Sequence, residues 1–133
     1  MFKTLVRKHF DFLKTEYGFG DNPHTFGYKK GIIELEFYYG KGEIEICFFI
    51  RRADDIFKAY VSRTFDLLSI IRIERQSDIV FPENLRGYMI SDEDMDNYLY
   101  FVAKLTRKYC VRQLDGDMSL FEALHLEWRG VKK

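Results

Sequence analysis

The chain reads IIELEFYYGKGEIEICFFI over residues 32–50, and this stretch decides the fold. Large apolar residues alternate with other residues on both sides of Gly40-Lys41-Gly42, with the period of two that a half-buried β-strand requires. Glycines between two such runs are typical of a tight turn. The stretch therefore predicts an antiparallel β-hairpin that turns at residues 40–42.

The alternation also predicts which side chains share a face of the hairpin. Apolar positions are odd-numbered before the turn and even-numbered after it, so a loop of two or four residues keeps them together. A three-residue loop would mix the two faces, and we do not expect it. The face that enters the core is predicted to carry Ile33, Leu35, Phe37, Ile44, Ile46, Phe48 and Ile50.

Patterns outside the hairpin predict the remaining elements. Apolar residues at three- and four-residue spacing indicate a first helix over residues 2–17, which Gly18 would end. Glycine and proline make residues 20–23 a predicted loop, and residues 26–28 suggest a short strand. Residues 56–62 fit a third strand or a helix, and we favour the strand because two strands alone are marginally stable. A short helix is expected over residues 65–74, and residues 76–90 are predicted to be mostly loop.

Two further helices complete the chain. Ser91 is a predicted cap for a long helix whose first turn carries Asp92, Glu93 and Asp94. Ser119 and Glu122 have the spacing of a capping box for a last helix, which reaches about Trp128. The whole order predicts a single α+β domain over residues 1–133, with an antiparallel sheet of three to four strands. An N-terminal helix precedes the sheet, and one short and two longer helices follow it and pack on one sheet face.

Composition narrows the function classes. Of the 133 residues, 47% are apolar and 17% aromatic, as in a packed globule, and the formal net charge is zero. Nucleic acid is not the expected partner, because binding to phosphates generally needs excess positive charge. No apolar run is long enough to cross a bilayer, and the first residues lack the pattern of a signal peptide. Since Cys47 and Cys110 form no paired motif, we expect a cytoplasmic protein with reduced thiols.

Catalytic and metal-binding signatures are missing from the sequence. His9, His24 and His125 do not have the spacing of a zinc site, and His9 lies on or beside the apolar stripe of the first helix. Cys47 alternates within a strand, where a cysteine is most often a packing residue. The basic run over residues 104–112 is interpreted as a solvated helix face. We expect no enzyme activity, no metal and no cofactor.

The second face of the hairpin is the candidate site. Glu34, Glu36, Glu43 and Glu45 are predicted to project from it, where like charges on neighbouring strands repel. Large side chains accompany them, and the predicted partner-binding residues are Glu34, Glu36, Tyr38, Glu43, Glu45 and Phe49. Two interpretations remain open: Arg51, Lys58 or a helix lysine neutralises the carboxylates, or this face receives a basic partner.

Residues 10–19 read FDFLKTEYGF, and this helix end with the aromatic-rich strands that follow resembles small bacterial toxin-immunity proteins. Such proteins accompany polymorphic toxins or those of contact-dependent inhibition, and the likeness covers about residues 2–73. It implies a cytoplasmic, non-enzymatic protein that binds and blocks a cognate toxin. Toxin nucleases are often basic, which would suit the glutamate face.

Two other hypotheses belong to different classes. One is a small enzyme or nucleic-acid-processing domain whose hairpin carboxylates hold a divalent metal. The other is self-association into a homo-oligomer through the same face.

Overall fold

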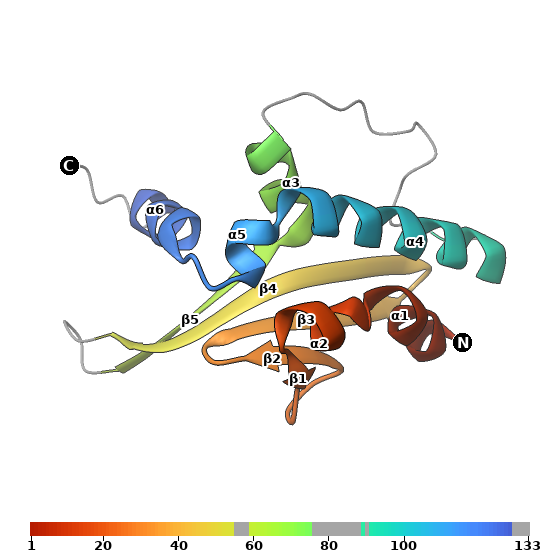
Figure 1. The fold of residues 1–133 in the computed structure, drawn as a ribbon, viewed down its shortest axis with the longest axis horizontal. Coiled ribbons are helices and arrows are strands. Elements are labelled where there is room, and N and C mark those ends of the chain that lie inside the picture. Colours follow the sequence, from red (N-terminus) through yellow and green to blue (C-terminus); the bar gives the residue numbers. More distant parts are fainter. Residues whose placement is uncertain (55–58, 76–88, 90, 129–133) are drawn as a thin grey trace.

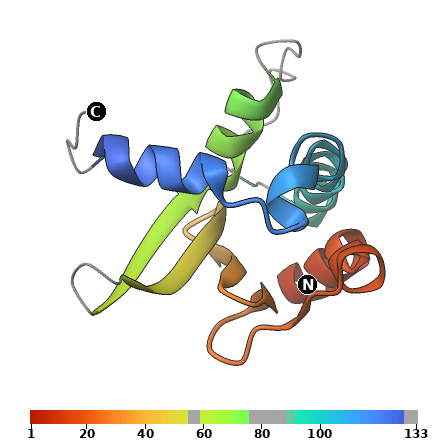
Figure 2. The same ribbon diagram turned by 60° about the vertical axis from the view of Figure 1, so that its left-hand side comes forward.

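A computed structural model describes residues 1–54, 59–75, 89 and 91–128 of the chain, with the backbone alone at 51–54, 59–64, 75 and 125–128. Helices α1 (Phe2–Phe10) and α2 (Phe12–Tyr17) precede strands β1 (Gly20–Asp21), β2 (Gly27–Lys30), β3 (Ile33–Gly40), β4 (Glu43–Asp54) and β5 (Ala59–Asp66) (Figure 1). Helices α3 (Leu67–Arg75), α4 (Asp92–Tyr109), α5 (Val111–Leu114) and α6 (Ser119–Trp128) follow. The strands form a five-stranded antiparallel sheet in chain order, and the helices cover one of its faces (Figure 2). The predicted α+β fold is confirmed.

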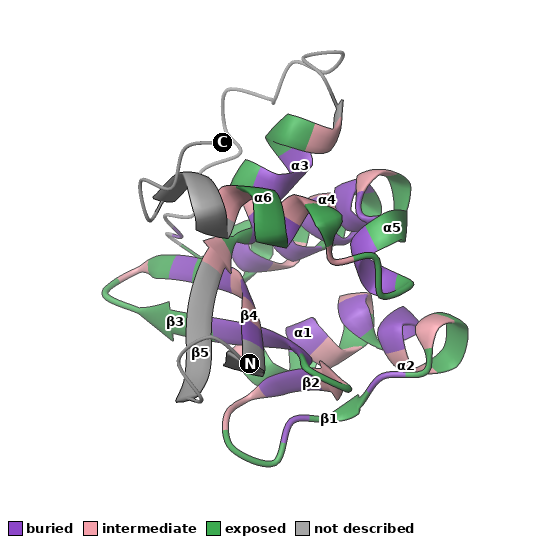
Figure 3. Ribbon diagram, turned by 90° about the vertical axis from the view of Figure 1, so that its left-hand side faces the viewer, coloured by how far each residue is buried: buried purple, intermediate pink, exposed green. Residues whose placement is uncertain are grey.

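The hairpin of β3 and β4 has one of the registers that the alternation of the sequence allows. Gly40 lies opposite Glu43, so the loop consists of Lys41 and Gly42 alone. Their φ angles of 54° and 79° are both left-handed, as in the turn type whose twist suits a two-residue hairpin. All seven predicted core residues of the hairpin are buried, and Leu35 and Phe48 are fully so. Figure 3 shows buried positions of the strands and of the helices facing the interior.

Helices from both ends of the chain meet this buried sheet face. The ring of Phe10 in α1 lies 4.9 Å, edge to face, from that of Phe37 in β3. The ring of Phe121 in α6 lies 5.1 Å from Phe48 and 5.0 Å from Phe65. Aromatic rings in these arrangements add to the free energy of apolar burial. The inner face of the sheet is therefore covered at both its β3 side and its β5 side.

The first helix forms as two consecutive segments. Asp11 lies between α1 and α2 with helical backbone angles, so the predicted stripe over residues 2–17 is almost continuous. Gly18 ends α2 with a φ of 77°, as predicted. The predicted loop over residues 20–23 is wrong in part, because Gly20 and Asp21 pair with β2 as the two-residue strand β1. A fifth strand is added to the expected three or four.

The later elements also follow the sequence closely. Residues 59–62 lie in β5, which confirms the third strand there, whereas residues 55–58 lie outside the described part of the chain. The short helix predicted over residues 65–74 begins at Leu67. The predicted loop over residues 76–90 lies outside the described residues except for Met89, whose N–H donates to the Gly42 carbonyl at 2.5 Å. Ser91 caps α4 as predicted, since its hydroxyl accepts from the Asp94 N–H at 3.2 Å.

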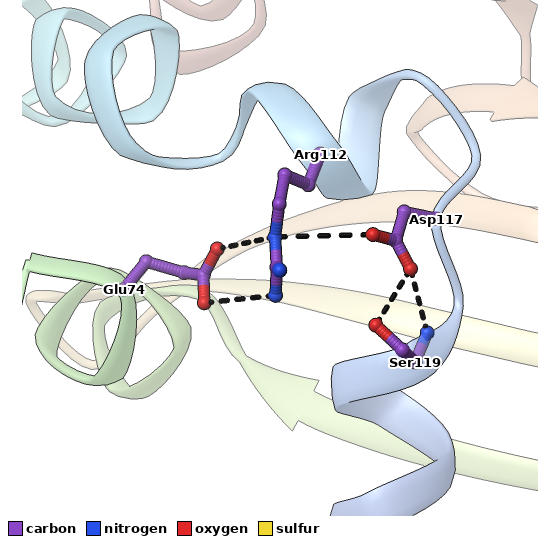
Figure 4. A network of polar contacts seen from close by, with 4 residues as sticks. All are labelled: Glu74, Arg112, Asp117 and Ser119. Carbon is purple, nitrogen blue, oxygen red and sulfur yellow. Dashed lines mark hydrogen bonds and ion pairs between the residues drawn. The ribbon is translucent and has the colours of Figure 1, made fainter.

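A polar network joins the helices of the C-terminal half (Figure 4). The Arg112 guanidinium of α5 donates to both carboxylate oxygens of Glu74 in α3, at 3.1 and 3.4 Å. The same guanidinium lies 3.9 Å from Asp117, which accepts from the N–H and the hydroxyl of Ser119 at 2.9 and 2.6 Å. The sequence predicted that Ser119 itself would be the capping residue. In the structure Ser119 is the first residue of α6, and Asp117 supplies the capping carboxylate.

Candidate functional site

The outer face of the hairpin, opposite the helices, carries all six predicted site residues. In the β3–β4 register Glu34 lies opposite Phe49, Glu36 opposite Cys47, Tyr38 opposite Glu45, and Gly40 opposite Glu43. Residues directly opposite in an antiparallel pair point to the same face. The outer face is defined here by Glu34, Glu36, Tyr38, Glu43, Glu45, Cys47 and Phe49, and it continues onto β5 at Asp66, opposite Cys47.

The four glutamates differ in their access to solvent. Glu43 and Glu45 are exposed, next to Tyr38, which is 46% exposed. Glu34 is fully buried and Glu36 is only 6% exposed. The four glutamates share the predicted face, but the two on β3 are not open to solvent. Glu43, Glu45 and Tyr38 are therefore accessible from solvent, whereas Glu34 and Glu36 are not.

The loop between β1 and β2 explains the burial of Glu34. The side-chain amide of Asn22, itself 8% exposed, donates to Glu34 Oε1 at 2.7 Å. Its oxygen accepts from the backbone N–H groups of His24 and Thr25, at 3.0 and 3.4 Å, which fixes the orientation of the amide. The Asn-Pro pair at residues 22–23 signals such a turn, but the sequence does not show which strand the turn contacts. Asn22 is therefore a site-supporting residue that the sequence analysis missed.

A bond between two side chains on the same strand connects the buried and the exposed parts of the outer face. The Tyr38 hydroxyl donates to Glu36 Oε1. This hydrogen bond, burial, and the charges of Glu36 and Glu34 raise the pKa of Tyr38 to about 12. Tyr38 is thereby held as a neutral phenol beside the carboxylates, with nearly half of its surface exposed.

The pKa of Cys47 is raised in part by the negative charges of the outer face. Burial first, and then the charges of Asp66, Glu45 and Glu36, raise the pKa of its thiol to about 11. A thiol with this pKa is protonated near neutral pH, which makes it a poor nucleophile. Since negative charge nearby disfavours the thiolate, the same charges attract cationic groups.

The interpretation in which internal cations neutralise this face named Arg51, Lys58 or a helix lysine as the cation. The side chain of Arg51 and all of Lys58 lie outside the described part of the structure. Lys29 of β2 lies opposite Glu34 in the register, on the same face. The described outer face thus presents exposed carboxylates together with Tyr38 and the half-buried Phe49.

The histidines and Cys110 were the other groups considered for catalysis or metal binding. The side chain of His9 is only 10% exposed, and its Nε2 lies 2.5 Å from Asp96 Oδ1. His24 is exposed, and the His125 side chain lies outside the described residues. Burial raises the pKa of the Cys110 thiol to about 12. Among the described residues, no three or more His, Cys, Asp or Glu side chains are grouped as a metal site would need.

The remaining findings concern membrane spans and similarity to known proteins. In the parts that the structure describes, no helix has both the length and the apolar character needed to span a bilayer. No protein-family model matches the sequence, and no curated protein or solved structure is significantly similar to it.

Proposed function

We propose that the protein is a cytoplasmic, non-enzymatic immunity or inhibitor protein that binds a cognate, basic bacterial toxin through the outer face of the hairpin. The observation that carries this proposal is the concentration of carboxylates around Tyr38 and Cys47. Their charges contribute to the raised pKa values of both side chains. The likeness of residues 2–73 to toxin-immunity proteins supports the class of partner.

The accessible residues define how a basic partner would dock. The exposed carboxylates of Glu43 and Glu45 pair with lysine or arginine at the rim, where charge mainly accelerates encounter. The Tyr38 ring supplies a flat apolar surface at which a guanidinium can stack. The buried carboxylates of Glu34 and Glu36 strengthen the field without moving, because Asn22 and Tyr38 hold them.

The first experiment is affinity capture from the source cell with the wild-type chain and two variants, Glu45→Lys and Glu43→Lys. Each reverses one exposed charge and leaves the buried pair intact. Asp115→Lys is the matched control, since it makes the same change in net charge at an exposed turn after α5. We expect one basic protein in stoichiometric amount with the wild type and the control, and about tenfold weaker capture with each hairpin variant.

The second experiment tests neutralisation directly. The captured protein is expressed alone and together with this chain, and growth is followed. We expect growth arrest by the captured protein alone and recovery with the wild-type chain, but weaker recovery with Glu45→Lys. A captured protein that is harmless, or equal recovery with wild type and Glu45→Lys at equal expression, contradicts the proposal.

A further inference from the structure

A second charged region lies in the helix layer, on the other side of the sheet from the outer face. Helices α1 and α4 run side by side there (Figures 1 and 2). Between them is a hollow of about 560 Å³, lined by Lys8, His9, Tyr100, Ala103, Lys104, Arg107 and Lys108. This volume is in the range of pockets that hold small organic ligands. We call it the α1–α4 groove.

The charge of the groove is one-sided. Four of the lining residues carry permanent positive charge, and among the described residues no carboxylate lines the hollow. Lys104 and Lys108 are one helical turn apart, where like charges repel and destabilise a helix. Lys104 has no hydrogen bond or ion pair within the described part of the chain, and Lys108 lies over the ring of Tyr109. Two neighbouring ammonium groups thus face the groove without an anion between them.

The other two cations are paired at the rim of the groove, in bonds that can exchange. Lys8 lies 3.2 Å from Asp96, and Arg107 lies 2.6 Å from Glu16, with the side chains of both cations more than half exposed. Exposed pairs of this kind contribute little net free energy, because solvent and salt screen them. Their guanidinium and ammonium groups can therefore turn to a ligand with several negative charges at small cost.

The groove also has an aromatic wall. Tyr100 is 57% exposed, a large fraction for a tyrosine ring, and lies edge-on to the His9 ring at 5.8 Å. The His9 ring is held in place through its bond to Asp96. Aromatic rings next to cations are the combination that binds a nucleobase together with its phosphates. An exposed ring beside unpaired lysines matches a ligand that has both a flat and an anionic part.

We propose that the α1–α4 groove binds a nucleoside polyphosphate, whose base stacks on Tyr100 and whose phosphates contact Lys104, Lys108 and Arg107. Such a ligand brings about three or four negative charges, which is the number of cations in the groove. The proposal is independent of toxin binding, since its residues come from α1 and α4 and not from the hairpin.

The test is isothermal titration of the full chain with ADP, pyrophosphate and adenosine, together with amide chemical shifts. We expect ADP to bind more tightly than either fragment, with shifts centred on residues 100–108. Lys104→Glu is expected to weaken ADP binding about tenfold or more, because a charge-assisted contact becomes repulsive. Lys3→Glu, the same change on an exposed part of α1 outside the groove, should leave ADP binding unaltered.

A second variant separates the two parts of the ligand. Tyr100→Ala should weaken ADP binding several-fold and leave pyrophosphate binding unchanged. Absence of ADP binding at millimolar concentration overturns the proposal, and so does equal binding by wild type and Lys104→Glu. Equal affinity for pyrophosphate and ADP overturns the nucleoside assignment. Tighter binding of a polyglutamate peptide than of ADP would assign the groove to an acidic protein segment and overturn the proposal.

Discussion

Replacing Asn22 tests whether its amide holds the buried Glu34 carboxylate. Asn22→Ala removes the 2.7 Å hydrogen bond to Glu34 and the acceptor for two backbone N–H groups. A hydrogen bond to a charged group contributes about 1.5–3 kcal/mol. We therefore expect Asn22→Ala to lower the free energy of unfolding by about 2–3 kcal/mol, and the melting temperature by about 10 °C for a domain of this size.

Asn22→Asp is the sharper variant. It keeps an oxygen for the N–H groups of His24 and Thr25, but it places a second carboxylate against Glu34. Two unit charges about 4 Å apart repel by about 4 kcal/mol at an effective dielectric constant of about 20. At pH 7 this variant should be less stable than Asn22→Ala, although it is closer in shape to the wild type.

The pH dependence gives the decisive measurement. As the pH falls from 7 to about 4, the folded Asn22→Asp variant takes up a proton between the two carboxylates before the unfolded chain does. Its stability should therefore rise relative to the wild type over this window, as measured by urea denaturation followed by circular dichroism. Asn97→Asp, at an exposed position of α4, is the control and should show neither effect. A constant difference between Asn22→Asp and wild type from pH 7 to 4 would refute the reasoning.

Three other outcomes follow from local geometry. Gly27→Ala should prevent folding or lower the free energy of unfolding by about 3 kcal/mol or more in thermal melts, because its Cβ would lie 1.8 Å from a backbone oxygen of β3. Gly20→Ala is the control and should be tolerated, since there is open space around Gly20. With its pKa raised to about 11, Cys47 should be alkylated at pH 8 about a hundredfold more slowly than a free cysteine, as followed by mass spectrometry. Glu45→Gln should accelerate this alkylation, because it removes one of the charges that raise the pKa. Hydrogen bonds from His9 and Lys8 lower the pKa of Asp96, so its carboxylate stabilises the fold above about pH 4 and loses this effect below it. The difference in the free energy of unfolding between wild type and Asp96→Asn should therefore shrink between about pH 5 and 2, as measured by urea denaturation.

The hairpin was predictable because its determinants are local. A period of two and a turn at residues 40–42 suffice to assign the core face, and the register from Ile33↔Ile50 to Gly40↔Glu43 is one of those that parity allows. The Ser91 cap and the left-handed Gly18 are local in the same way, since each depends on a few neighbouring residues. The two-residue strand β1 was not predictable, because it exists only through its pairing with β2.

Which glutamates of the outer face are buried could not be predicted from the sequence, for a different reason. Alternation assigns Glu34 and Glu45 to the same face, but it cannot show that the loop at Asn22 reaches the first and leaves the second open. The α1–α4 groove needs contact between residues about 90 positions apart, such as His9 and Asp96, so the sequence shows only a basic run that looks like a solvated helix face. Contacts set by chain folding therefore decide which charged groups are accessible.

The two charged regions together change the meaning of a net charge of zero. Glu43 and Glu45 are exposed on the outer face of the sheet, and Lys104 and Lys108 are exposed on the helix layer, so regions of opposite charge coexist in a chain whose formal net charge is zero. Under the proposed function, a cationic toxin would be drawn to the outer face and repelled from the α1–α4 groove, so it would arrive already oriented. A nucleoside polyphosphate is drawn in the opposite sense. Because both attractions are electrostatic and exposed, each should weaken as salt shortens the screening length to about 8 Å, whereas burial of Phe48 and Phe121 in the core should not depend on salt.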